Sequence, residues 1–133
     1  MAAGNYSFTI EQGATTDFEI TYQDSSNTPV DLTGYTARMQ IRPNVGSDTV
    51  LLTLSSSLDA CGTGLNLSGS NGTTPLSSGS IGVFISAASS SLLDFDNGQY
   101  DLEIASGSGN CAVVTRLLKG NVKLSKEITQ GSY

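Results

Sequence analysis

Apolar and polar residues alternate most regularly near the carboxyl end of this chain. In residues 100–104 a tyrosine, a leucine and an isoleucine are separated by two acidic residues, which is the two-residue period of a strand with one buried and one solvated face. A Gly/Ser turn cluster at residues 106–110 follows, and a second apolar run begins at residue 113. The stretch 98–129 therefore predicts a β-hairpin with a long second strand, around which we expect the rest of the chain to be organised.

The predicted hairpin has a definite register. If residues 107–110 form its loop, Asp101 faces Arg116, an opposite-charge pair of the kind that supports strand pairing. The pairs on the other face are Ile104 with Val113, Leu102 with Thr115, and Tyr100 with Leu117. The later apolar positions have the opposite parity, so we expect a β-bulge near residues 118–120.

Further strand signals occur upstream, separated by turn-rich stretches. They lie at residues 6–10, 18–22, 35–42, 50–54, 65–67 and 80–86. We expect residues 30–34 to cross from one sheet to another, about 55–79 to form a long Ser/Gly-rich loop, and Ser86 to cap one or two helical turns over residues 87–93, with Ala88 and Leu92 on one face. The pattern predicts an all-β fold, an Ig-like antiparallel β-sandwich of about seven to eight strands with one short helical turn.

The chain has 133 residues, enough for a single domain with its own core, and we assign residues 1–133 to one domain. Its core is expected to form from apolar positions that share a parity within their strands. These are Phe8, Phe18, Ile20, Tyr35, Met39, Ile41, Val83, Ile85, Tyr100, Leu102, Ile104, Leu118 and Val122.

Two blocks of the sequence resemble small structural domains of tailed phages. One is Tyr-Asp-Leu-Glu-Ile at 100–104, a Gly/Ser turn, and Val-Thr-Arg-Leu-Leu-Lys-Gly-Asn-Val-Lys-Leu-Ser-Lys-Glu-Ile-Thr at 114–129. The other is Thr-Pro-Val-Asp-Leu-Thr-Gly-Tyr-Thr-Ala-Arg-Met-Gln-Ile-Arg at 28–42. Their order and spacing are similar to those of Ig-like phage proteins akin to the N-terminal domain of baseplate upper proteins. The resemblance implies a structural component of the tail or baseplate, not an enzyme.

Charge and hydropathy narrow the choice of partners. The net charge is −6, and six basic residues scattered among twelve acidic ones do not supply the clustered cations that nucleic acid requires. No apolar run approaches the roughly 18 residues of a membrane span, and the first residues lack the features of a secretory signal. We therefore expect no nucleic-acid or membrane partner and assembly in a cytoplasm. The resemblance to phage proteins implies that this is the host cytoplasm and that the final location is the virion.

The residue types needed for common catalytic and metal sites are missing. Without histidine there is no Ser-His or Cys-His pair and no histidine-based zinc site, and two cysteines do not supply four thiolates. The acidic cluster at residues 94–98 loosely resembles a calcium loop, but we interpret it as a turn. We expect no enzymatic activity, cofactor or metal.

Two cysteines, Cys61 and Cys111, fall in predicted Gly-rich loops, and two states are open for them. They are free thiols if the protein stays in a reducing compartment, whereas a virion outside the cell permits a disulfide. A bridge would close a loop of about 50 residues and contribute roughly 3–4 kcal/mol in the chain-entropy model.

The candidate interface residues are apolar side chains on nominally outward strand faces, together with one arginine: Leu51, Phe84, Val114 and Arg116. The favoured function is a tail or baseplate adaptor that connects the tail body to fibres or receptor-binding proteins, with other virion proteins and copies of itself as partners. Exposed strand edges and the polar segments 1–5, 68–79 and 130–133 are expected to contact neighbours. The alternatives are a capsid decoration protein and a module that binds a host-surface glycan or receptor.

Overall fold

The computed structural model describes residues 4–69, 72–107 and 111–129, and its strands form two sheets. The strands of sheet A are β1 (Gly4–Asn5), β2 (Phe8–Glu11), β4 (Tyr35–Arg42), β5 (Leu52–Ser55), β8 (Asn97–Ser106) and β9 (Val113–Ser125). Those of sheet B are β3 (Thr16–Thr21), β6 (Gly64–Asn66) and β7 (Ser80–Ile85). A 3₁₀ turn, η1 (Leu76–Ser78), and a short helix, α1 (Ala87–Ser91), lie in the connections.

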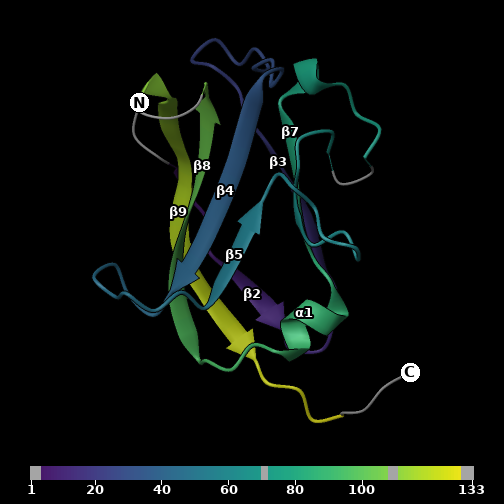
Figure 1. Cartoon of the computed structure of the whole chain (residues 1–133), viewed down its shortest axis with the longest axis vertical. Coiled ribbons are helices and arrows are strands. Elements are labelled where there is room, and N and C mark those ends of the chain that lie inside the picture. The colour runs from purple at the N-terminus through teal and green to yellow at the C-terminus, as the bar shows by residue number, and fades with distance from the viewer. Residues whose placement is uncertain (1–3, 70–71, 108–110, 130–133) are drawn as a thin grey trace.

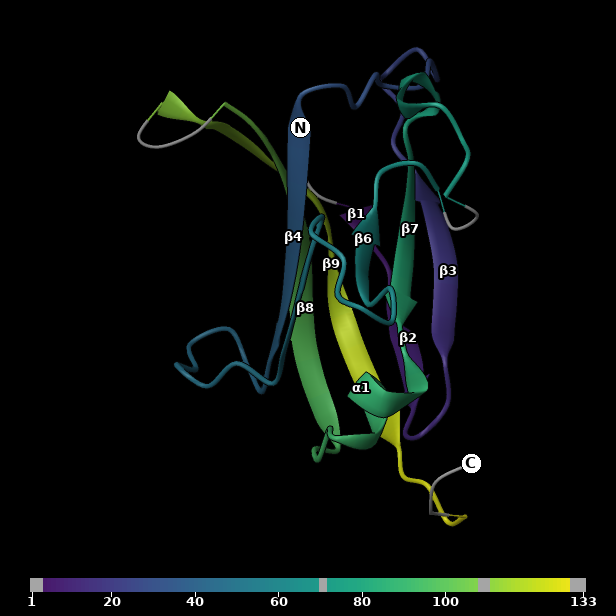
Figure 2. The ribbon, with the colours of Figure 1, turned by 45° about the vertical axis from the view of Figure 1, so that its right-hand side comes forward.

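The two sheets pack face to face as a β-sandwich (Figure 1). Sheet A has the order β1–β9–β8–β4–β5, with β2 also paired to β9, and sheet B has the order β3–β7–β6. Figure 2 shows the sheets nearly edge-on, with β3, β7 and β6 opposite β4, β8 and β9, and the β8–β9 hairpin projecting beyond the sandwich. This strand order is that of an Ig-like sandwich, so the predicted fold class is confirmed. The connection from β3 to β4, which contains residues 30–34, crosses between the sheets as expected.

The two N-terminal strands, β1 and β2, run parallel to β9. The prediction of an antiparallel sandwich was wrong for these strands. Gly4 lies opposite Leu118 in β9, and Ile10 lies opposite Leu124. The sequence did not reveal this direction, because side chains alternate with a period of two in both parallel and antiparallel strands.

The core lies between the sheets, and no predicted core residue is exposed. Eight of them are buried: Met39, Ile41, Val83, Ile85, Tyr100, Leu102, Ile104 and Val122. The other five are half-buried and pack against the core: Phe8, Phe18, Ile20, Tyr35 and Leu118. The prediction omitted further buried residues: Ile10, Leu32, Ala37, Leu54, Leu65, Ile81, Leu93 and Leu124. Leu32 and Leu93 were missed because they lie in connections, where strand parity gives no information.

The central hairpin forms, but its predicted register is wrong. Ile104 pairs with Thr115 rather than Val113, and Leu102 pairs with Leu118, so the connection between the strands is longer than the predicted four-residue loop. The expected bulge is present one residue early: the register shifts between Leu102 and Glu103, leaving Leu117 as the extra residue. The bulge resolves the change of parity that the sequence showed.

The predicted helical turn is present as α1, and Ser86 caps it. The Ser86 hydroxyl accepts a hydrogen bond from the backbone N–H of Ser89 at 3.2 Å. The face of this helix was predicted wrongly, because Ala88 and Leu92 are exposed whereas Ser90 is fully buried. The Ser90 hydroxyl donates to the Ala14 carbonyl at 2.8 Å and so joins α1 to the turn between β2 and β3.

The long connection after β5 contains more structure than a loop. Its strand β6 pairs with β7, and η1 lies just before β7. Of the segments expected to order against neighbours, Gly4–Asn5 already forms β1, while residues 1–3, 70–71 and 130–133 lie outside the described residues.

Candidate interaction surfaces

The outer face of sheet A carries a cross-strand arrangement of charges. The register aligns Arg38 of β4, Glu103 of β8 and Arg116 of β9 in one row, and Gln40, Asp101 and Lys119 in the next. Glu103 therefore stands between basic side chains on both neighbouring strands, whereas Asp101 has the uncharged Gln40 on one side and Lys119 on the other. This order places no like charges directly opposite one another.

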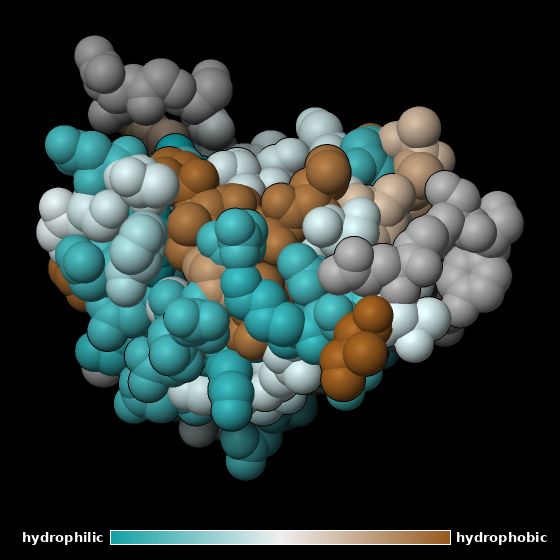
Figure 3. Space-filling model, turned by 90° about the horizontal axis from the view of Figure 1, so that it is seen from below, coloured by the Kyte–Doolittle hydropathy of each residue, from teal (hydrophilic) through white to brown (hydrophobic). Residues whose placement is uncertain are grey.

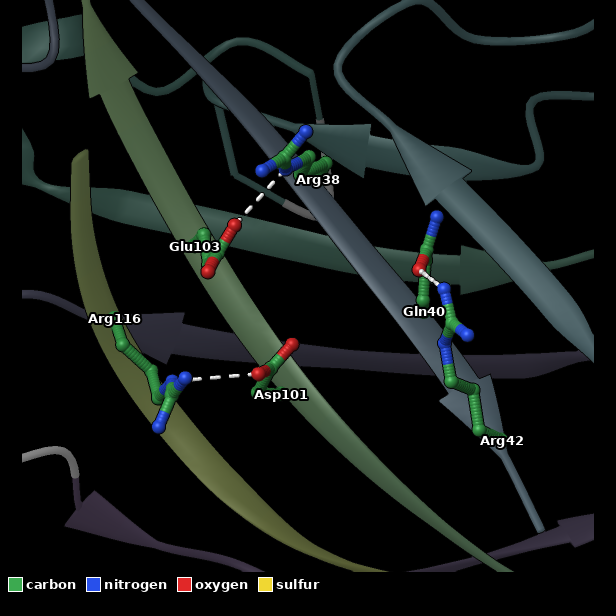
Figure 4. A network of polar contacts seen from close by, with 6 residues as sticks. All are labelled: Arg38, Gln40, Arg42, Asp101, Glu103 and Arg116. Carbon is green, nitrogen blue, oxygen red and sulfur yellow. Dashed lines mark hydrogen bonds and ion pairs between the residues drawn. The ribbon is translucent and has the colours of Figure 1, made fainter. Parts of the chain in front are cut away.

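Figure 4 shows the contacts that result. The Arg38 Nε lies 2.9 Å from the Glu103 Oε1, and the Arg116 Nε lies 3.3 Å from the Asp101 Oδ2. Arg42 donates to the Gln40 Oε1 at 2.9 Å. The expected contact between Asp101 and Arg116 is thus confirmed as an ion pair, although the two residues are not directly opposite. Each exposed pair contributes only about 0–1 kcal/mol, so the network fixes side-chain positions more than it stabilises the fold.

The same face concentrates the basic residues of the protein. Of the six in the sequence, five project from the outer side of β4 and β9: Arg38, Arg42, Arg116, Lys119 and Lys123. With Asp101, Glu103 and, on β2, Glu11 also on it, this face has a formal charge of +2, which leaves −8 for the rest of a chain whose net charge is −6. The sequence did not show this segregation, because it arises only when β4 and β9 lie on either side of β8. The face forms an open depression of about 570 Å³ suited to electrostatic contact with another surface.

The four candidate interface residues do not form one patch. Phe84 belongs to sheet B and is half-buried, and Leu51 is half-buried against the core. Val114 is half-exposed on the outer face of sheet A near the hairpin end, and Arg116 lies two residues further along the same strand. Leu51 adjoins Ile41 at the opposite end of sheet A. A role in partner binding stays a prediction for each of them.

Apolar side chains reach the surface at the end of the sandwich formed by α1 and the β4–β5 loop. Figure 3, viewed from below, shows this apolar area surrounded by polar side chains. The exposed apolar residues at this end include Val50 and Leu92. Of the candidate interface residues, Leu51 and Phe84 lie toward this end, since Leu51 follows the β4–β5 loop and Phe84 precedes α1 by three residues.

Both cysteines are free and exposed in the structure. The backbone N–H of Cys61 donates to the Asp59 Oδ1 at 2.8 Å in the β5–β6 connection, and Cys111 lies just before β9 in the hairpin connection. Whether they form a bridge in other conditions stays a prediction. Non-reducing mass spectrometry of the purified protein tests it.

The acidic cluster at residues 94–98 lies in the connection from α1 to β8, with a bend at Asp96, and its last two residues begin β8. Lys126 donates to the Asp94 Oδ1 at 2.5 Å, and this hydrogen bond lowers the pKa of Asp94 and raises that of Lys126. At Asp31 the pKa is also lowered, by hydrogen bonds from the Thr33 hydroxyl and backbone N–H. Across the described residues, no three histidine, cysteine, aspartate or glutamate side chains gather closely enough to bind a metal ion.

An aromatic cluster joins the N-terminal strand to the core and was not anticipated as a unit. The ring of Phe8 lies between those of Phe18 and Tyr100, with ring centroids 5.0 and 5.1 Å apart, and Tyr6 completes the group. The Tyr100 hydroxyl donates to the Tyr6 carbonyl at 2.5 Å. Burial of this phenol raises the pKa of Tyr100 to about 12. The only sequence signal was the alternation at residues 6–10, which predicted a strand but not its neighbour.

The sequence matches no known protein family, and no curated protein matches it either. Within the described part of the chain, no helix has both the length and the hydropathy needed to cross a membrane.

Proposed function

We propose that this chain is a structural protein of a tailed-phage virion, an adaptor that connects the tail body to fibres or receptor-binding proteins. The observation that carries the proposal is where the two phage-like sequence blocks lie in the fold. The block 28–42 supplies β4, and the block 100–129 supplies β9 and most of β8. These three strands lie side by side in sheet A, with β8 in the centre. The resemblance therefore covers one contiguous structural unit rather than separate fragments.

An adaptor needs a stiff body and at least two surfaces of different chemistry, and this molecule offers both. The sandwich core supplies the body. The basic outer face of sheet A suits an acidic neighbour, while the strands at the edges of the sheets have main-chain groups that another chain can pair with. In this proposal the partners are other virion proteins and further copies of the chain itself.

Locating the protein in intact particles by cryo-EM tests the proposal directly. We expect density for the sandwich at the tail or baseplate, in contact with at least two different proteins. Particles that lack the gene should lose their fibres or fail to infect, and expression of the gene in trans should restore them. Density on the capsid shell instead would identify a decoration protein. Normal fibres and infectivity without the gene would also contradict the adaptor function.

A further inference from the structure

Two open strand edges lie on the same side of the sandwich. In sheet A, β2 pairs only with β9, and in sheet B, β3 pairs only with β7. The chain passes directly from β2 to β3 through a tight turn in which the Ala14 N–H donates to the Glu11 carbonyl at 3.0 Å. The two strands therefore lie on the same side of the sandwich (Figure 2).

The register shows which main-chain groups point out of the β3 edge. Tyr22, opposite Gly79, donates its N–H to the carbonyl of that residue at 2.8 Å. Because hydrogen-bonded and non-hydrogen-bonded pairs alternate along an antiparallel ladder, Phe18 bonds to β7 whereas the N–H and C=O of Asp17 point away from it. By the same reasoning the main-chain groups of Thr9 point out of the β2 edge, since Tyr6 and Gln12 donate to β9.

Between these edges lies a cleft of about 440 Å³ with an aromatic floor. The rings of Tyr6, Phe8 and Phe18 line it, and their centroids are 5.0–6.3 Å apart. Tyr6 is 46% exposed, and the other two rings are half-buried. In a closed sandwich, apolar side chains between the sheets are covered. Here part of the aromatic floor is left accessible to solvent.

Two carboxylates stand at the same cleft. Glu11 and Asp17 both line it and are both exposed. Among the described residues, neither side chain takes part in an ion pair or a side-chain hydrogen bond. The basic residue nearest in register is Lys123 of β9, opposite Thr9, and among the described residues it forms no ion pair with either carboxylate.

We propose that this β2–β3 cleft accepts an extended segment of a neighbouring protein in which Lys or Arg alternates with apolar residues. A strand added along β3 pairs with the outward main-chain groups of Asp17 and extends sheet B. Alternate side chains of such a strand point to opposite faces, so one set contacts the aromatic floor and the other lies beside the Asp17 carboxylate. The inference deepens the proposed adaptor function by naming the chemistry of one partner.

Hydrogen exchange of the free protein first tests the edge geometry. The Asp17 amide should exchange faster than that of Phe18, since only the latter donates into the ladder. The binding probe is a capped synthetic peptide, Lys-Val-Lys-Val-Lys-Val-Lys, titrated into isotope-labelled protein. We expect chemical-shift changes concentrated in β2 and β3 and slower exchange of the Asp17 amide in the complex.

Matched controls separate charge, pattern and main-chain pairing. A peptide with Glu in place of Lys should not bind, and a permuted peptide, Lys-Lys-Val-Val-Val-Lys-Lys, should bind more weakly because its side chains do not alternate. Asp17→Asn should weaken binding about two- to fivefold, the loss expected for one exposed ion pair. Asp48→Asn removes the same charge from the β4–β5 loop and should have no effect.

Asp17→Pro removes the outward N–H, which a proline on an edge strand permits, and should abolish pairing. If that variant does not fold, two peptides replace it, each N-methylated at every second amide and differing in which of the two alternating sets is methylated. Only methylation of the set that faces β3 should block binding. Equal binding of the Lys and permuted peptides, shifts confined to the outer face of sheet A, or no binding at about millimolar peptide would overturn the proposal. Such a failure is distinct from failure of the adaptor function, which depends on where the protein lies in the particle.

Discussion

Gly120 in β9 is the position where one added methyl group should do the most damage. A Cβ atom there would lie 2.1 Å from the carbonyl oxygen of Tyr6 and 2.7 Å from its carbonyl carbon, both of them main-chain atoms. It would also lie 3.2 Å from the Tyr100 ring. Carbon atoms need about 3.5 Å for favourable contact, so the N-terminal strand must move by more than about 1 Å to accept alanine.

That movement has a definite cost. It breaks the hydrogen bond from the Tyr6 N–H to the Lys119 carbonyl, which is 3.0 Å long, and the one from the Tyr100 hydroxyl to the Tyr6 carbonyl. Each bond contributes about 0.5–1.5 kcal/mol, and forcing atoms into a packed site typically costs about 1–3 kcal/mol. Alanine recovers up to about 1 kcal/mol by restricting the unfolded chain. We therefore expect Gly120→Ala to lower the free energy of unfolding by about 2–4 kcal/mol.

Urea unfolding followed by circular dichroism measures this loss. Gly46→Ala is the matched control, since the nearest heavy atom to its added Cβ is the Asn44 Oδ1 at 3.9 Å, and it should change stability by less than about 0.5 kcal/mol. The slope of the free energy against urea should stay unchanged if both states keep their compactness. Tyr100→Phe should cost less in the Gly120→Ala background than alone, because the bond to Tyr6 is already broken there. Equal stability of the two alanine variants, or full additivity with Tyr100→Phe, would refute the reasoning.

Three other outcomes follow from buried groups. Leu102→Ala should lower the free energy of unfolding by about 2–5 kcal/mol in the same urea experiment, because the leucine is fully buried at the centre of sheet A; a loss below 1 kcal/mol would contradict that placement. Ser90→Ala should cost about 1–3 kcal/mol, since it leaves the partly buried Gly13 N–H without its acceptor at 3.0 Å, while Ser90→Thr, which keeps the hydroxyl, tests whether the bond or the volume matters. Stability should be independent of Tyr100 below about pH 10, the ordinary pKa of tyrosine, and should fall as the pH rises toward 12, because only the folded state has the raised pKa. Tyr100→Phe should remove this part of the pH dependence, and an unchanged alkaline unfolding profile in that variant would exclude Tyr100 as its source.

The alternation of apolar residues was enough to predict most strands and the fold class. It placed β4 at residues 35–42, as the structure has it, and it located β7 and β8 within about a residue. It also placed the start of α1 correctly and its end within two residues. These elements are local: their side chains repeat every two residues, and Ser86 caps a helix that begins at the next residue. The bulge in the hairpin was also visible, since a change of parity within one strand requires an extra residue.

The sequence pattern could not determine the register of the β8–β9 hairpin, for a physical reason. Shifting the pairing of β8 and β9 by two residues keeps every side chain on its face, so the alternation fits both registers equally. The predicted contact between Asp101 and Arg116 exists in the structure at 3.3 Å because long side chains reach diagonal neighbours as well as direct ones. That contact therefore did not determine the register.

The candidate surfaces were decided by tertiary structure alone. The sequence shows scattered basic residues, and they gather on one face only because β4 and β9 both lie next to β8. It shows a strand near residues 6–10, but the cleft at Glu11 and Asp17 exists because β2 joins sheet A in parallel with β9 while β3 begins sheet B. Local pattern determines which residues form strands and which side chains face inward. Which strands become neighbours, and which edges stay open, depends on how the whole core closes.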